Sequence, residues 1–164
     1  MTIGSYSYKI RTQFSFIADD HTLSSILSNI ANMGITITGY MQTRLIYLDN
    51  NDKNEHHPKQ NIVRLVAGNA HSETSSDLSG VRDALASLHV DFQEKAILQA
   101  LGIILEIPGQ ISTIFGALWC KVAVFALYNG EENTLFVDTS DTCKALLILS
   151  QASARLCSDV KCEE

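Results

Sequence analysis

The sequence predicts an α+β fold in which strands and helices alternate in two successive units. From Ile103 to Trp119 a β-branched apolar run changes, after Pro108-Gly109, to a helical period. Apolar residues then recur at i, i+3, i+4 and i+7, as one face of a helix: Ile111, Ile114, Phe115 and Leu118. The same pattern stands 88 residues earlier: Leu23, Ile26, Leu27 and Ile30. A strand and a turn precede the helix in both places, which indicates an internal repeat.

The first unit is expected to have the order βαββαβ. Strands are predicted at residues 11–18, 35–48, 61–68 and 90–96, with helices from residue 23 to Gly34 and from 75 to 89. Gly34 can adopt the left-handed conformation that ends a helix, and Gly39 is expected to form a bulge. Residues expected to cap the helices with a side-chain oxygen are Asp20 or Thr22 for the first, and Ser76 or Asp77 for the second. Residues 49–60 are predicted to form a polar hairpin loop.

The second unit is expected to follow directly. It is predicted to contain strands at 98–106, 121–128 and 133–139, and helices at 110–119 and from Asp141 or Ser140 to about residue 156. The sequence leaves open whether the polar tail supplies a fourth strand or the second unit lacks one. The predicted domains are therefore residues 9–96 and 97–157, followed by a tail at 158–164.

Composition excludes several classes of function. The chain has 164 residues, 46% of them hydrophobic, and a net charge of -6, with its excess of acidic residues in the second half. No concentrated basic surface is visible, so nucleic acid is not an expected partner. The polar start lacks a signal peptide, and the apolar run at 96–105 is too short to span a bilayer. A soluble cytoplasmic protein without a membrane partner is expected.

Several short segments together resemble the ACT domain, a ferredoxin-like module that senses small molecules. Glu106-Ile107-Pro108-Gly109-Gln110-Ile111 resembles the family's strand end, turn and helix start. Further similar segments are Phe136-Val137-Asp138, Lys144-Ala145-Leu146, Asn32-Met33-Gly34-Ile35-Thr36-Ile37 and Arg82-Asp83-Ala84-Leu85. The resemblance covers roughly residues 9–156 and implies two ferredoxin-like ACT-type βαββαβ units, with antiparallel sheets and helices packed on one face. Asp20-His21 departs from the family's Pro-Gly, and Cys120-Lys121 from its glycine-containing link.

In ACT-like proteins a small ligand binds where the first loop meets the first helix. By resemblance, the candidate ligand residues in the second unit are Pro108, Gly109, Gln110 and Ile111. Their counterparts in the first unit are Asp20, His21 and Thr22. A helix start offers unpaired N–H groups, which suit a carboxylate. The alternatives are that Pro108-Gly109 only turns the chain, and that Asp20 or Thr22 only caps a helix.

No catalytic residue, metal site or cofactor is predicted. His56-His57 lacks the further ligands that a metal needs, and the serines near His71 show no nucleophile motif. No Cys-x-x-Cys pair occurs, so free thiols are expected. The sequence therefore predicts a non-enzymatic regulatory protein, expected to be a homodimer, that senses a small ligand such as an amino acid. The alternative is a structural or dimerisation module without a ligand.

Overall fold

The computed structural model describes residues 6–45, 59–103 and 108–151, which form an α+β fold with antiparallel strand pairs and four helices. The described residues divide into two units. The first unit consists of residues 12–95, and the second of 96–151 together with 6–11. Two strands, β1 (Ser7–Asp19) and β4 (Phe92–Leu101), therefore contribute residues to both units. The first described residues, 6–11, are therefore grouped with the C-terminal ones.

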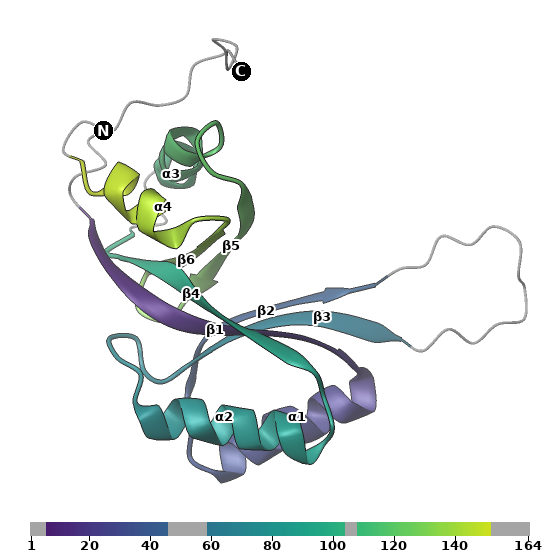
Figure 1. Cartoon of the computed structure of the whole chain (residues 1–164). Helices are drawn as coiled ribbons and strands as arrows, with labels where there is room; N and C mark the ends of the chain where they lie inside the picture. The colour runs from purple at the N-terminus through teal and green to yellow at the C-terminus, as the bar shows by residue number, and fades with distance from the viewer. Residues whose placement is uncertain (1–5, 46–58, 104–107, 152–164) are drawn as a thin grey trace, which may run out of the picture. The chain divides into compact units, whose positions relative to one another are not determined.

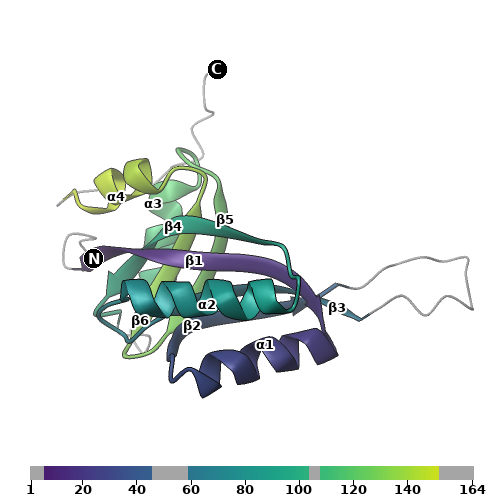
Figure 2. The ribbon, with the colours of Figure 1, turned by 60° about the horizontal axis from the view of Figure 1, so that its bottom comes forward.

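The first unit places two helices on one face of an antiparallel sheet. After β1 come α1 (Asp20–Asn32), β2 (Ile37–Arg44), β3 (Gln60–Ala67) and α2 (Ser75–Ser87). Strand β3 pairs with β1 on one side and with β2 on the other. Figure 1 shows α1 and α2 below these strands, and Figure 2 shows the two helices side by side. The order of elements is βαββαβ, as the resemblance implied.

Alternation along the strands builds the core of this unit. Successive strand residues point to opposite faces, so Phe14, Phe16 and Ala18 all face the helices. The ring of Phe14 lies 5.9 Å from that of Phe92, which joins β1 to β4. Residues from both helices and from β3 complete the cluster: Leu23, Ile26, Ile30, Val81, Ala84, Leu85, Val63, Leu65 and Ala67.

Helix α2 begins at Ser75 as predicted, but the capping residues of both helices lie one to three residues before the predicted ones. Asp19, rather than Asp20 or Thr22, caps α1 by accepting from the Thr22 backbone N–H at 2.8 Å. Thr74, rather than Ser76 or Asp77, caps α2, and Asp77 completes a reciprocal capping box. A cap must keep extended backbone angles while its oxygen reaches the first turn, so neighbouring polar residues compete for the position.

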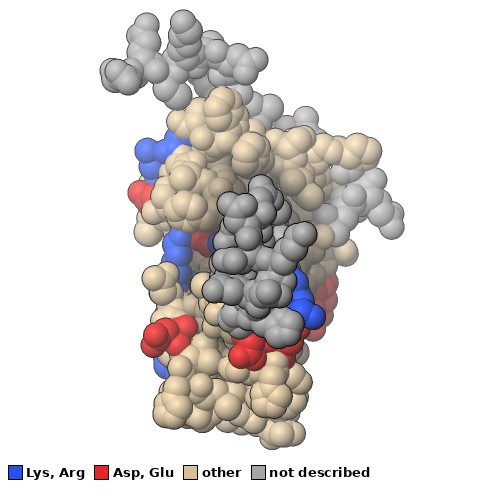
Figure 3. Space-filling model, turned by 90° about the vertical axis from the view of Figure 1, so that its right-hand side faces the viewer, with Lys and Arg blue, Asp and Glu red and all other residues tan. Residues whose placement is uncertain are grey.

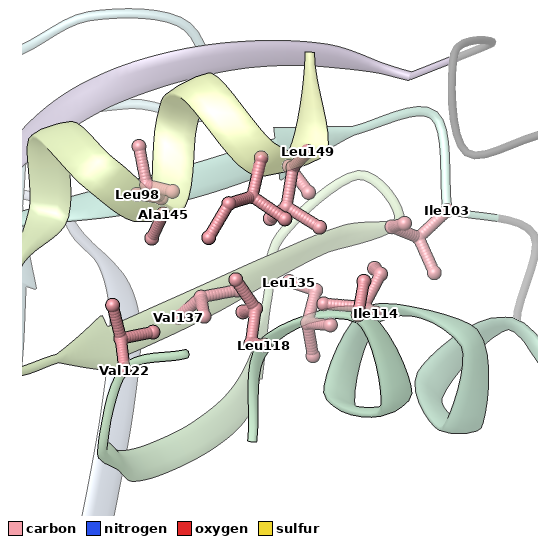
Figure 4. Packing of buried hydrophobic residues seen from close by; sticks show 12 residues of the cluster. Leu98, Ile103, Ile114, Leu118, Val122, Leu135, Val137, Ala145 and Leu149 are labelled. Atoms are coloured by element: carbon pink, nitrogen blue, oxygen red, sulfur yellow. The ribbon is translucent and has the colours of Figure 1, made fainter. Parts of the chain in front are cut away.

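The second unit has its own hydrophobic core. Its elements are the C-terminal part of β4, then α3 (Gln110–Leu118), β5 (Val124–Gly130), β6 (Thr134–Thr139) and α4 (Thr142–Leu149). Strand β6 pairs with both β4 and β5, and all six of its residues are buried. Figure 4 shows side chains from both helices and from β4 and β6 converging in the core. Asp141 caps α4, as predicted.

Strand β4 replaces two predicted strands with one. Residues 90–96 and 98–106 were predicted as two strands, but Phe92–Leu101 is one continuous strand. The segment contains no Gly or Pro that would interrupt it. The first left-handed residue after it is Gly102, with φ +77°.

Residues 6–11 are part of the second unit, and β1 already begins at Ser7. Tyr6 and Tyr8 pack against its core. Burial, with a smaller contribution from Tyr6, raises the pKa of the Tyr8 hydroxyl to about 12. The buried Arg11 donates from Nη1 to Oε1 of Gln99 on β4 at 2.9 Å. The predicted tail at 158–164 lies outside the described residues.

The cysteines also differ from the prediction. Cys120 is disulfide-bonded, whereas Cys143 is free and exposed. Pairing depends on proximity in the folded chain, which spacing along the sequence does not report. Cys157 and Cys162 lie outside the described residues. Within the described segments, no helix has both the length and the apolar character needed to cross a membrane.

Candidate ligand site at the first strand–helix junction

An open pocket of about 960 Å³ lies in the first unit, where β1 ends and α1 begins. Its walls come from three separated segments: Ser15–Asp19 with Thr22, then Gln60 and Ile62, and finally Leu88–Gln93. The register of the sheet brings the first two together, because Ile17 lies opposite Ile62 and Asp19 opposite Gln60. Its volume is within the range of small-molecule pockets.

Asp19 connects the pocket with the helix start. Its carboxylate accepts from the Thr22 N–H, and this hydrogen bond lowers the pKa of Asp19 below its usual value. Thr22 is the one predicted ligand residue among those lining the pocket. His21 is exposed and is not part of the lining.

Asp20, another predicted ligand residue, is held by protein groups. Arg44 on β2 donates from Nη2 to its two oxygens at 2.8 and 2.9 Å. Asn61 on β3 donates from Nδ2 to Oδ1 at 2.8 Å. These bonds, that of Asn61 first, lower the pKa of Asp20. The carboxylate therefore ties the start of α1 to the sheet.

Asn61, between the lining residues Gln60 and Ile62, is the centre of a polar network. It is fully buried, and its amide also donates to the Ala18 carbonyl at 3.3 Å. Its Oδ1 accepts from Gln42 Nε2 at 2.8 Å, and the Tyr40 hydroxyl donates to Gln42 Oε1 at 2.8 Å. The network fixes the end of β1 and therefore the position of Asp19.

His89 also lines the pocket, and its backbone has a left-handed conformation with φ +55°. Its N–H donates to the Ala86 carbonyl, and the Val90 N–H donates to that of Leu85. This is the pattern of a Schellman motif, in which glycine is the usual left-handed residue. A side chain at this position costs on the order of 1 kcal/mol, although histidine tolerates it better than most residues.

A bidentate ion pair fixes the segment after His89. Arg82 on α2 donates to Glu94 on β4 through Nε at 2.6 Å and Nη2 at 2.7 Å. The Arg82 guanidinium lowers the pKa of Glu94. Two rigid elements therefore bound the loop that carries His89 and Asp91 into the pocket.

The second predicted junction is in the other unit. Gly109 begins α3 with φ +92° and without a side-chain cap, and its carbonyl accepts from the hydroxyls of Ser112 and Thr113. Pro108 and Gly109 are exposed, whereas Gln110 is buried. The predicted single apolar face is wrong in part: Ile114 and Leu118 are buried, but Ile111 and Phe115 are each 44% exposed. Since a helix turns by 100° per residue, four apolar positions can span more than the buried sector. Residues 104–107 lie outside the described residues.

The charged surface is mixed on the face shown in Figure 3, where Lys and Arg side chains lie among Asp and Glu. Across the described residues, no three His, Cys, Asp or Glu side chains gather as a metal site requires. The adjacent histidines His56 and His57, for which no metal site is predicted, lie outside the described residues.

No protein-family model matches the sequence. A comparison with curated protein sequences also finds no match.

Solved structures match the fold. Protein BT0572 from Bacteroides thetaiotaomicron is similar with a TM-score of 0.60 and 15% identity, over 87% of this chain and 88% of that one. The regulatory subunit of aspartate kinase from Thermus thermophilus, in its ligand-free form, gives 0.56 and 14%, over 90% and 95%. That from Thermus flavus gives 0.55 and 13%, over 93% and 99%. The chain thus has an ACT-like α+β fold.

Sequence reasoning missed most of the pocket. His89 and Asp91 follow α2 and belong to no periodic pattern, so only the folded sheet brings them to Asp19. A local signal existed for His89: the helix from Ser75 ends before His89-Val90-Asp91 with no glycine at the position where one is usual.

Proposed function

We propose that this protein is a non-enzymatic regulatory module that binds a small ligand, an amino acid, at the pocket beside Asp19 and Thr22. The pocket carries the proposal, because it lies at the junction of β1 and α1 where the resemblance expects a ligand. Two of the similar folds are regulatory subunits of aspartate kinase, one described in a ligand-free form. We further propose that the sequence comprises two tandem ACT-like domains, residues 9–96 and 97–157, although residues 9–11 group with the second unit.

Binding of an amino acid is expected to appear as heat in calorimetric titration and as a raised melting temperature. A ligand at a hundredfold excess over its dissociation constant adds about 2.7 kcal/mol to stability. Screening the proteinogenic amino acids against the full chain is the direct measurement. No heat and no thermal shift with any of them would contradict the amino-acid proposal.

Three matched variants identify the binding junction. Ile17→Arg places a long cation in the pocket and is expected to abolish binding, because Ile17 is 51% exposed and lines it. Ile10→Arg is the control on the same strand, at 49% exposure and outside the pocket. Ile111→Arg tests the second junction, at Pro108–Ile111. Loss of binding in Ile111→Arg alone would move the site to the second unit.

The alternative function is self-association into a homodimer. The observation that favours it is an apolar stripe on α3, in which Ile111, Phe115 and Trp119 are 44–45% exposed at intervals of four residues. Residues four apart lie on one helix face, so the three side chains form a continuous surface that a second copy can cover.

A dimer formed through this stripe is expected to dissociate when Phe115 and Trp119 are both replaced by serine. Sedimentation velocity across a range of concentrations measures the change. Leu147→Ser is the control, because Leu147 is 69% exposed on α4 and is not part of the stripe. A wild-type chain that stays monomeric at high concentration would rule the dimer out.

A further inference from the structure

The pocket beside Asp19 has an asymmetric charge that bears on its ligand. Two aspartates are among its lining residues, Asp19 at the end of β1 and Asp91 before β4. Lysine and arginine do not occur among the described residues that line it. The nearby guanidinium of Arg44 is already bound to Asp20. Lys59, whose charge also acts on Asp20, is next to the lining residue Gln60 but is not itself part of the lining. The lining residues therefore favour a cation over a carboxylate.

The start of α1 does not compensate for this charge. A helix N-terminus usually attracts anions through its free N–H groups. Here Asp19 itself accepts from the Thr22 N–H, and the Asp20 carboxylate lies in the same first turn. The charge of Asp19 opposes an incoming carboxylate at this end of the helix, whereas that of Asp20 is paired with Arg44.

The remaining lining residues suit the apolar part of a ligand that carries a cationic group. Ile17 and Ile62 lie opposite each other on the sheet, and Val90 adds a third branched apolar side chain. The imidazole of His89 accepts a hydrogen bond when it is neutral, as an ammonium group requires.

We propose that this pocket recognises its ligand through an ammonium group, held between Asp19 and Asp91, with an apolar body against Ile17 and Ile62. This rests on the proposed function, since it assigns the ligand class of the same pocket. It goes further in making the ammonium group necessary and a carboxylate dispensable. An amino acid binds by its amine end, and an alkylamine without a carboxylate binds as well.

Two sets of probes with matched skeletons test this on the full chain by calorimetry. The first set is L-leucine, 3-methylbutylamine and 4-methylpentanoate, and the second is L-phenylalanine, 2-phenylethylamine and 3-phenylpropanoate. At least one amine is expected to bind at least as tightly as its parent amino acid, while neither carboxylate binds. Absence of binding by both amines, or equal binding of the carboxylates, would overturn the proposal.

Variants assign the ammonium group to the pocket. Asp91→Asn is expected to weaken amine binding about twofold to fivefold, as loss of an exposed ion pair does. Asp83→Asn removes an exposed carboxylate of α2 outside the pocket and is expected to leave binding unchanged. Equal effects of the two substitutions would show only a general influence of charge and would contradict the assignment.

His89→Gly separates binding from folding. Glycine relieves the left-handed backbone at φ +55°, so the melting temperature is expected to rise while amine binding weakens. Unchanged binding would remove His89 from the site, and unchanged binding in both His89→Gly and Asp91→Asn would overturn the proposed pocket geometry. A failed amino-acid screen together with amine binding would instead contradict the proposed function and leave the amine site standing.

Discussion

Replacing Phe14 by alanine is expected to lower the free energy of unfolding by about 3–5 kcal/mol, the usual cost of removing a buried phenylalanine. Phe14 is fully buried at the centre of the first unit's core, and its ring contacts that of Phe92 across to β4. The variant leaves a cavity between the sheet and the helices and also removes this aromatic contact. Urea denaturation followed by circular dichroism measures the loss.

The matched control for Phe14→Ala is Ile17→Ala, three residues further along the same strand. Ile17 faces the other side of the sheet and is 51% exposed. Its truncation is expected to cost less than about 1 kcal/mol, as surface substitutions generally do. Similar losses in both variants would mean that β1 is not buried on one face only.

The second large effect is expected from Asn61→Leu. Leucine has a similar size but no polar atoms, so the variant breaks the bonds to Ala18, Asp20 and Gln42. The Ala18 carbonyl loses a bond at a buried position, and the expected loss of stability is about 2–3 kcal/mol. Chemical denaturation of the variant and wild type measures it. Tyr40→Phe is the control, because it removes only the outermost bond of the same network, with an expected cost below about 1 kcal/mol.

Asn61→Leu also has a signature in pH dependence. Asn61 is the first cause of the lowered pKa of Asp20, whose ordinary value is 3.8. A carboxyl with a lowered pKa in the folded state stabilises the fold above pH 3.8, and this contribution is lost as pH falls through the folded pKa. The variant should raise the pKa of Asp20 towards 3.8 and reduce the loss of stability below about pH 4. An unchanged Asp20 titration, followed by NMR, would show that the bond contributes little.

The regular elements were predictable because they depend on local patterns. The recurrence of Leu23, Ile26 and Ile30 identified α1, and these three residues are its buried ones. The left-handed Gly34 after this helix and the bulge near Gly39 followed from glycine's conformational freedom.

Features decided by tertiary structure were not predictable. On α3, the same kind of recurrence placed Phe115 beside Ile114, but only Ile114 reached the core. Strand β4 continues through Ala96, where the symmetry of two equal units suggested a break. In both cases neighbouring elements decided the outcome, and the local sequence was compatible with either.

The candidate site was predicted at the correct junction of the first unit but with few of its residues. Thr22 lines the pocket, whereas the carboxylate of Asp20 is bound within the sheet and His21 is exposed. Asp91 lines the same pocket as Asp19 although the two are far apart in the sequence, and no local sequence pattern reveals that the fold brings them together. The expected roles of Pro108, Gly109, Gln110 and Ile111 stay a prediction.

The division of β1 between the two units has a consequence for biosynthesis. The whole core of the first unit lies between residues 12 and 95, so it can form once that segment has left the ribosome. The core of the second unit includes Tyr8, and Arg11 is hydrogen-bonded to Gln99. These two early residues therefore make their contacts only after Gln99 and the following strands have been synthesised. Closure of the second unit spans a long loop, which slows folding unless the enclosed residues are already ordered. Early folding of residues 12–95 shortens that loop. Folding of the first unit is therefore expected to speed the closure of the second unit, which residues 6–11 and 96–151 form.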